Sequence, residues 1–134
     1  MNGVDVTLKY MKKQNRGIVF TNLVDFDMLF GHRNNVEGYK QAIEEFDKRL
    51  PEIKAAMRED DLLIISADHG CDPTTPSTDH SREYVPVLLY GHNIKKDVNL
   101  GTRKTFSDIA STIAEIFDIE NVFPGNSFLE VILK

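Results

Sequence analysis

The sequence predicts an α/β fold, because strand-like apolar runs alternate with segments in which apolar residues recur at helical spacing. Two of the runs, residues 17–24 and 62–67, lead directly into carboxylate and imidazole side chains. If both runs are parallel strands of one sheet, their carboxyl ends lie on the edge where such folds bind ligands. With a third run at 85–91, the strands make about half of an ordinary doubly wound sheet. We therefore expect the fold to be incomplete in this chain.

The first half of the chain predicts two helices around the first strand. Residues 4–12 form a short helix, which Asn15, Arg16 and Gly17 end. Residues 36–57 form a longer helix, because their apolar residues recur at spacings of three and four. Pro51 is expected to kink or divide that helix, since proline lacks the backbone N–H that a helix interior uses.

The second half predicts a strand, a helix and a final packed segment. Pro86 favours the beginning of the strand at 85–91. Thr105 and Asp108 resemble a capping box, with Asp in place of the usual Glu, and open a helix with an apolar stripe. Residues 124–133 predict a turn and one last packed segment.

Length and composition set outer limits on the function. The 134 residues, 41% of them hydrophobic, are enough for one small domain, expected over residues 1–134. A net charge of −5 without a basic block argues against nucleic acid or an anionic membrane as partner. No apolar run approaches membrane-spanning length. Since lone Cys71 makes no internal disulfide, the cytoplasm is the expected compartment.

Two clusters of metal-binding side chain types follow the first two strands. Neutral imidazole and carboxylate oxygen suit zinc, manganese or magnesium, whereas a thiolate cage is excluded by the single cysteine. Two such ions, roughly 3.5–4 Å apart, stabilise in-line displacement at phosphorus, so phosphoryl or sulfuryl transfer is the leading reaction class. Singly, each residue has an ordinary alternative as a turn former or a solvated loop residue, and Asp25 is easily confused with Asp27. The candidates are Asp25, Asp27 and His32 in the first cluster, and Asp68, His69 and His80 in the second.

Three stretches, 20–33, 67–74 and 78–86, closely resemble phosphopentomutase, a family of the alkaline phosphatase superfamily. The Asp-His-Gly at 68–70 is shared across that superfamily, including cofactor-independent phosphoglycerate mutase. The other two stretches narrow the resemblance to phosphopentomutase. It covers nearly the whole chain, which looks like the C-terminal part of the enzyme. The resemblance implies a three-layer α/β/α, alkaline phosphatase-like core, incomplete in this chain, without the cap domain and the N-terminal core segment.

The resemblance also implies an activity and a set of ligands. Phosphopentomutases interconvert ribose 1-phosphate and ribose 5-phosphate, and the deoxyribose equivalents, with two manganese ions and a phosphothreonine. When the family's ligands are carried over to this sequence, the resemblance implies that one ion is held by Asp27, His32 and His80, and the other by Asp68 and His69. The nucleophilic threonine and a further aspartate of the second site lie upstream in the family. We therefore assign no catalytic residue here, and expect at most one ion and no activity from this chain alone.

Three functional readings follow from these observations. The first is phosphopentomutase with a pentose phosphate substrate. The second is another metal-dependent phosphotransferase of the superfamily, such as cofactor-independent phosphoglycerate mutase. The third is a non-catalytic metal-binding remnant. In each of them the incomplete sheet predicts self-association, because an open strand edge invites pairing. Cys71 stands where the family usually has Asn and is expected to be a buried bystander near the metal.

Overall fold

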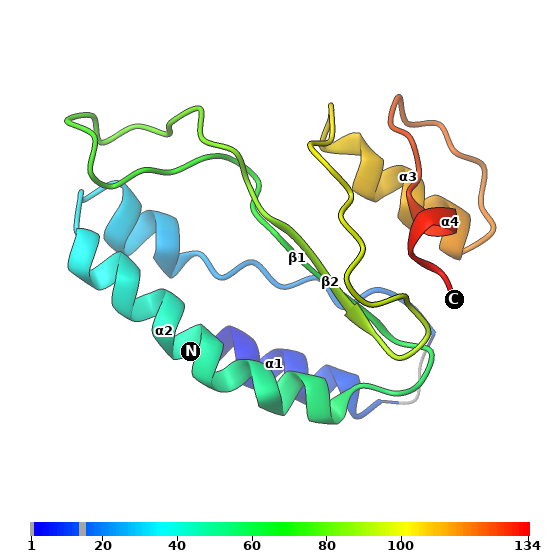
Figure 1. The fold of residues 1–134 in the computed structure, drawn as a ribbon. Helices are drawn as coiled ribbons and strands as arrows, with labels where there is room; N and C mark the ends of the chain where they lie inside the picture. The colour runs from blue at the N-terminus through cyan, green and yellow to red at the C-terminus, as the bar shows by residue number, and fades with distance from the viewer. Residues whose placement is uncertain (1, 14–15) are drawn as a thin grey trace. The chain divides into compact units, whose positions relative to one another are not determined.

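The structure is a computed structural model that describes residues 2–13 and 16–134 (Figure 1). These residues form two compact units, the first ending at Leu89 and the second extending from Tyr90 to Lys134. The prediction that residues 1–134 form one domain stays a prediction. In chain order the elements are α1 (Asn2–Met11), the π-helix η1 (Phe26–Gly31), α2 (Val36–Ala56), β1 (Leu62–Ser66), β2 (Val87–Gly91), α3 (Ser107–Ile116) and α4 (Leu129–Ile132).

Helices α1 and α2 pack against each other in the first unit (Figure 1). Val4 of α1 is buried, as are Ala42 and Ile53 of α2, which lie on the apolar stripe predicted from the sequence. At the start of α2 the Asn35 side chain accepts a hydrogen bond from the backbone N–H of Gly38 at 2.9 Å. This cap satisfies one of the N–H groups that a first helical turn leaves unpaired. Both helices predicted in this region are confirmed.

Helix α2 continues through Pro51, so of the two expected effects, a kink or a division, the division is wrong and the kink stays a prediction. Proline at this position removes the bond to the carbonyl four residues earlier, which belongs to Asp47. Asp47 is exposed to solvent, and Ile53 is buried beyond the proline. Packing of the stripe on both sides of Pro51 therefore outweighs the loss of one backbone bond.

The sheet contains two strands among the described residues, β1 and β2. Strand β1 lies within the predicted segment 62–67, and β2 begins directly after Pro86, so both predictions are confirmed. The predicted strand at 17–24 is not formed. Among the described residues, no backbone N–H of 18–25 donates to another backbone group. A strand requires a hydrogen-bonded neighbour, which this segment does not find.

Residues 18–24 instead lie over α1 with much of their apolar surface in solvent. The Thr21 hydroxyl is 2.7 Å from that of Thr7 on α1, and Leu23 packs against Gly3. The apolar side chains before this anchor remain exposed, with Ile18 63% and Phe20 87% accessible. The described helices and two-stranded sheet have the content expected of an incomplete α/β fold.

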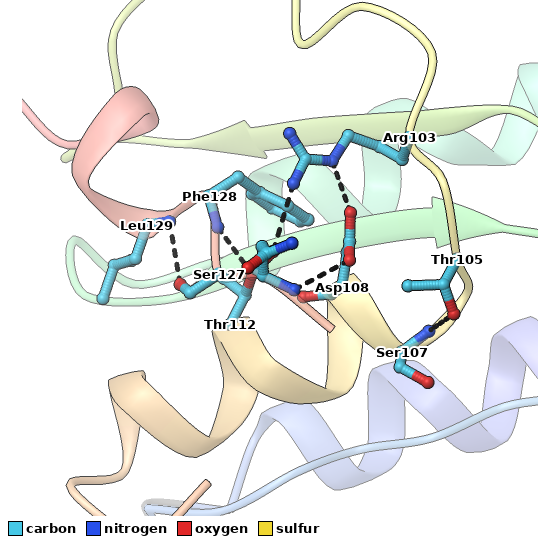
Figure 2. Close-up of polar contacts among 9 residues, drawn as sticks. Arg103, Thr105, Ser107, Asp108, Thr112, Ser127, Phe128 and Leu129 are labelled. Carbon is cyan, nitrogen blue, oxygen red and sulfur yellow. Dashed lines mark hydrogen bonds and ion pairs between the residues drawn. The ribbon is translucent and has the colours of Figure 1, made fainter. Parts of the chain in front are cut away.

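A buried polar network holds the second unit together (Figure 2). The Thr112 hydroxyl of α3 donates to the Asp108 carbonyl at 2.7 Å and accepts from the N–H of Phe128 at 3.1 Å. The Asp108 carboxylate, 3% exposed, accepts from Arg103 Nε at 2.6 Å and from the N–H of Asn126 at 2.9 Å. These bonds fix α3 to the segment that enters α4, where Phe128 is buried.

The predicted capping box at the start of α3 forms only in part. The Thr105 hydroxyl accepts from the N–H of Ser107 at 3.2 Å, as Figure 2 shows. Asp108 does not return a bond to Thr105, because its carboxylate is bonded to Arg103 and Asn126 instead. The ion pair with Arg103 and the hydrogen bond from Asn126 thus replace the bond to Thr105 that the sequence pattern suggested. None of the helices among residues 2–13 and 16–134 has the length and apolarity needed to cross a membrane.

We expect Asp108→Asn to destabilise the protein by about 2–3 kcal/mol at pH 7, since hydrogen bonds to a charged group are lost. Burial alone would raise the pKa of Asp108, but the Asn126 N–H and the Arg103 guanidinium outweigh it and hold the pKa below its usual value. The contribution is therefore complete above the unfolded pKa of about 3.9 and lost as the pH falls through the lower folded pKa.

Urea unfolding followed by circular dichroism at pH 7 and pH 3 measures this difference. Glu115→Gln, on the exposed face of the same helix, is the matched control and should leave stability unchanged. An Asp108→Asn variant as stable as the wild type at pH 7 would contradict the assignment.

Candidate metal centre

The candidate ligands come from three segments of the first unit. Asp27 lies in η1 and His32 directly after it, while Asp68 and His69 follow β1. The π-helical bond from the His32 N–H to the Asp27 carbonyl, at 3.0 Å, sets the relation between those two residues. Single π-helical turns are rare and occur often at functional sites.

The glycine of the Asp-His-Gly motif brings the third segment, which carries His80, to the end of β1. Gly70 and Ser81 form an antiparallel bridge, with the Ser81 N–H 3.2 Å from the Gly70 carbonyl. A Cβ at residue 70 would lie 2.5 Å from the Ser81 carbonyl oxygen, so only glycine permits this approach. The bridge stacks the rings of His69 and His80, whose centroids are 3.6 Å apart.

Three imidazoles converge on the Asp27 carboxylate. His32 Nε2 lies 3.3 Å from Asp27 Oδ2. Nε2 of His80 and Nε2 of His69 lie 3.6 Å and 3.9 Å from Oδ1. Asp68 joins at the margin, with its Oδ1 3.6 Å from His69 Nε2 and its side chain 74% exposed. All five predicted ligands are therefore linked by short contacts.

Backbone carbonyls fix which ring nitrogen of two of the histidines faces Asp27. His32 Nδ1 lies 2.6 Å from the Thr78 carbonyl oxygen, and His69 Nδ1 lies 3.1 Å from that of Gly70. A carbonyl only accepts, so each Nδ1 carries the proton. In a neutral ring the lone pair then belongs to Nε2, the nitrogen turned toward a carboxylate. This is the tautomer that a metal-binding imidazole adopts when its other nitrogen is held by a backbone acceptor.

One oxygen of the Asp27 carboxylate is not satisfied by the residues that the structure describes. This oxygen, Oδ1, is buried and has no hydrogen-bond partner among the described residues. The nearest nitrogens, from His69 and His80, are beyond hydrogen-bonding distance. An acceptor oxygen facing imidazole lone pairs in a buried position is costly, and a cation between them removes that cost. The arrangement therefore fits a bound metal ion.

The donor atoms agree with that conclusion. One ligand atom each from Asp27, His69 and His80 lies within 4.8 Å of the others. Donors bound at about 2.0–2.2 Å to one ion are separated by roughly 3–4 Å, so small movements would close the set around it. Nitrogen and oxygen donors without sulfur suit zinc, manganese or magnesium. Three protein ligands with an open position are typical of catalytic rather than structural sites.

The tight group differs from the predicted grouping of ligands. The sequence resemblance placed His32 with Asp27 and His80, whereas the tight group contains His69 in that place. His32 still contacts Asp27 through the other carboxylate oxygen. Asp25 is exposed and precedes η1, where its side chain makes no capping bond. The division of the five ligands between two ions stays a prediction.

Cys71 lies beside the cluster but contributes no atom to it. Its side chain is half-buried, and its Sγ packs against Gly31. Burial, together with the charges of Asp27 and Asp72, raises the pKa of the Cys71 thiol. Burial also raises the pKa of Tyr39, with Cys71 and Asp27 adding to the effect. A neutral thiol and a neutral phenol thus border the carboxylate.

Sequence reasoning missed the groups that orient the ligands. The Thr78 carbonyl and the Asn34 amide, which donates to the Thr75 carbonyl at 2.9 Å, hold the loop that carries His80. No side-chain signal could reveal a backbone carbonyl. Asp72 accepts from the N–H and hydroxyl of Thr74 and acts as a turn former.

Comparison with known proteins is consistent with this centre. Residues 1–121 match the family model described as the metalloenzyme superfamily. Phosphopentomutases of Acetivibrio thermocellus and Carboxydothermus hydrogenoformans are 62% and 65% identical over 133 residues, 99% of this chain. That of Lachnoclostridium phytofermentans is 57% identical over 132 residues. The chain spans about a third of the length of these relatives, 34% of each.

These relatives confirm the resemblance to phosphopentomutases that the three sequence stretches indicated. The predicted fold class, an α/β alkaline phosphatase-like core that is incomplete here, is confirmed by the family match together with the helices and two-stranded sheet. The chain belongs to the metalloenzyme superfamily.

Proposed function

We propose that this chain is the metal-binding part of a phosphopentomutase, which interconverts (deoxy)ribose 1-phosphate and (deoxy)ribose 5-phosphate through a metal-assisted phosphoenzyme. The observation that carries the proposal is the buried Oδ1 of Asp27, which has no hydrogen-bond partner among the described residues and lies beside the Nε2 atoms of His69 and His80. His32 lies at the other oxygen of the same carboxylate. The sequence similarity supports a pentose phosphate as the substrate, since relatives named phosphopentomutase match 99% of the chain at 62–65% identity. No observation favours phosphoglycerate as the substrate.

Asp27, His69 and His80 would hold one ion, with His32 on the second oxygen of Asp27. We propose manganese as the ion, and a second one near Asp68 and His69 in the whole enzyme. A bound divalent ion would neutralise the charge that develops on phosphoryl oxygens during transfer.

The residues of this chain prepare the site for that charge. Asp27 supplies the carboxylate around which the imidazoles gather, and backbone carbonyls hold His32 and His69 with Nε2 turned inward. Because these orientations exist before substrate binds, little reorganisation is needed during the reaction. Asp68 is the exposed member of the cluster and so the one most accessible to a substrate.

The nucleophile of a phosphoenzyme is expected outside this chain. Thr74 and Thr75 lie near the cluster in sequence, but their hydroxyls donate to Asp72. Both are accounted for as parts of a turn. The chain would thus contribute metal ligands to a reaction whose nucleophile is supplied by another part of the enzyme.

We expect the chain to bind at most one Mn²⁺ ion. Asp27→Ala and His80→Ala should weaken binding by more than about 100-fold, since loss of an outer partner alone costs 10- to 100-fold. Asp25→Ala is the matched control and should leave binding unchanged, because Asp25 is exposed and outside the cluster. Calorimetric titration decides the matter. Two equally tight sites, or a site abolished by Asp25→Ala, would show that the ligands are wrongly assigned.

We expect no conversion of ribose 1-phosphate by the 134-residue chain alone, because a mutase cycle cannot run without its nucleophile. A chain of the relatives' full length that includes this sequence should convert pentose phosphates and leave phosphoglycerates unchanged. A coupled assay with both substrate classes checks this. Turnover by the 134-residue chain, or a preference for phosphoglycerate in the longer one, would refute the proposal.

We also expect self-association through residues 18–24, where unpaired backbone and exposed apolar side chains lie together. Phe20→Lys should weaken the association by at least about tenfold, because a large buried apolar contact is lost. Val122→Lys, at another exposed apolar position, in the second unit, is the control. Sedimentation equilibrium measures the effect, and a wild-type chain that stays monomeric at high concentration would speak against it.

A further inference from the structure

We propose that Gly31 and Cys71 are positioning residues, whose contact sets the distance between Asp27 on η1 and His69 after β1. The inference rests on the proposed metal site and adds two residues that bind no metal themselves. Gly31 is buried, and Cys71 is half-buried beside it.

The contact leaves no room for a side chain on η1. A Cβ at residue 31 would lie 2.8 Å from Cys71 Sγ, well inside ordinary van der Waals contact of 3.4–4 Å. It would also lie 3.3 Å from the Phe26 carbonyl oxygen. Glycine therefore allows η1 to approach the Asp-His-Gly segment more closely than any other residue would.

The contact between Gly31 and Cys71 connects the two segments that carry the ligands, and each contact residue lies close in sequence to a ligand. Gly31 lies between Asp27 and His32, and Cys71 lies two residues after His69. The position that a Cβ at residue 31 would take is 3.5 Å from Asp27 Oδ1, the orphaned oxygen itself. A displacement of the backbone at Gly31 would thus also move the carboxylate of Asp27.

The opposite side of η1 is equally tight. The Phe30 ring packs on Gly38 of α2 so closely that a Cβ there would overlap it. The rings of Phe26 and Tyr39 meet edge to face with centroids 5.8 Å apart. Because η1 is held between α2 and Cys71, it cannot relieve a clash by moving toward α2. An added methyl group would push Cys71 and η1 apart, and we expect this to change the separation of Asp27 and His69, while metal–ligand distances tolerate only about 0.2 Å.

The test is Gly31→Ala in the 134-residue chain, titrated with Mn²⁺ alone by calorimetry and followed by the electron paramagnetic resonance of the bound ion. We expect about tenfold weaker binding, the low end of what loss of an orienting group costs. Cys71→Ala added to Gly31→Ala removes the sulfur that the methyl group would meet, and should restore affinity to within about threefold of wild type. Gly17→Ala is the matched control, because a Cβ there would meet nothing within 4 Å.

Specific rescue separates positioning from a general loss of stability, which is measured in parallel by thermal unfolding without metal. If Gly31→Ala does not fold, Cys71→Leu extends the opposite partner toward Gly31 and should weaken binding similarly. Wild-type affinity in Gly31→Ala or in Cys71→Leu, or a double variant as weak as Gly31→Ala alone, would overturn the positioning role while leaving the metal site intact. Absence of Mn²⁺ binding by the wild type would overturn both proposals.

Discussion

The half-buried carboxylate of Asp27, with its buried Oδ1, is the group on which the metal ligands of the first unit converge. Its Oδ1 has no hydrogen-bond partner among the described residues, and the Nε2 atoms of His69 and His80 lie near it at distances too long for hydrogen bonds. The third imidazole, that of His32, lies at the other oxygen. Burying an unsatisfied charge is destabilising unless an opposite charge compensates. The elements around Asp27, which are η1, the end of β1 and the loop that carries His80, therefore form a frame that positions ligands for a cation.

The frame depends on close approaches of backbone more than on a large apolar core. Gly70 lets the loop that carries His80 bridge to the end of β1, and Gly31 lets η1 approach Cys71. On the far side, Gly38 admits the Phe30 ring onto α2. In all three places a Cβ would collide with a neighbouring group. Asp27 and His32 lie within four residues of Gly31, and Asp68 and His69 lie within two residues of Gly70, so a side chain added at either glycine would change the distances between ligands.

The two compact units use different means of stabilisation. In the second unit the Asp108 carboxylate is buried with its bonds made by Arg103 and Asn126, so its charge is balanced within the protein. In the first unit the carboxylate of Asp27 is balanced only in part. The contrast between a satisfied and an unsatisfied buried carboxylate separates a structural role from a binding role.

Local pattern in the sequence determined much of this protein. The helical spacing at 36–57, the apolar run at 62–67 and the Asp-His-Gly that follows it predicted α2, β1 and the place of the ligands, because each depends on neighbours in the chain. Tertiary structure alone decided the rest. Residues 17–24 are as apolar as a strand but find no hydrogen-bonded neighbour among the described residues, and α2 passes through Pro51 because its packing continues. Likewise His69 joins Asp27 and His80 because a bridge between residues eleven apart, Gly70 and Ser81, stacks two rings, a contact that no local spacing encodes.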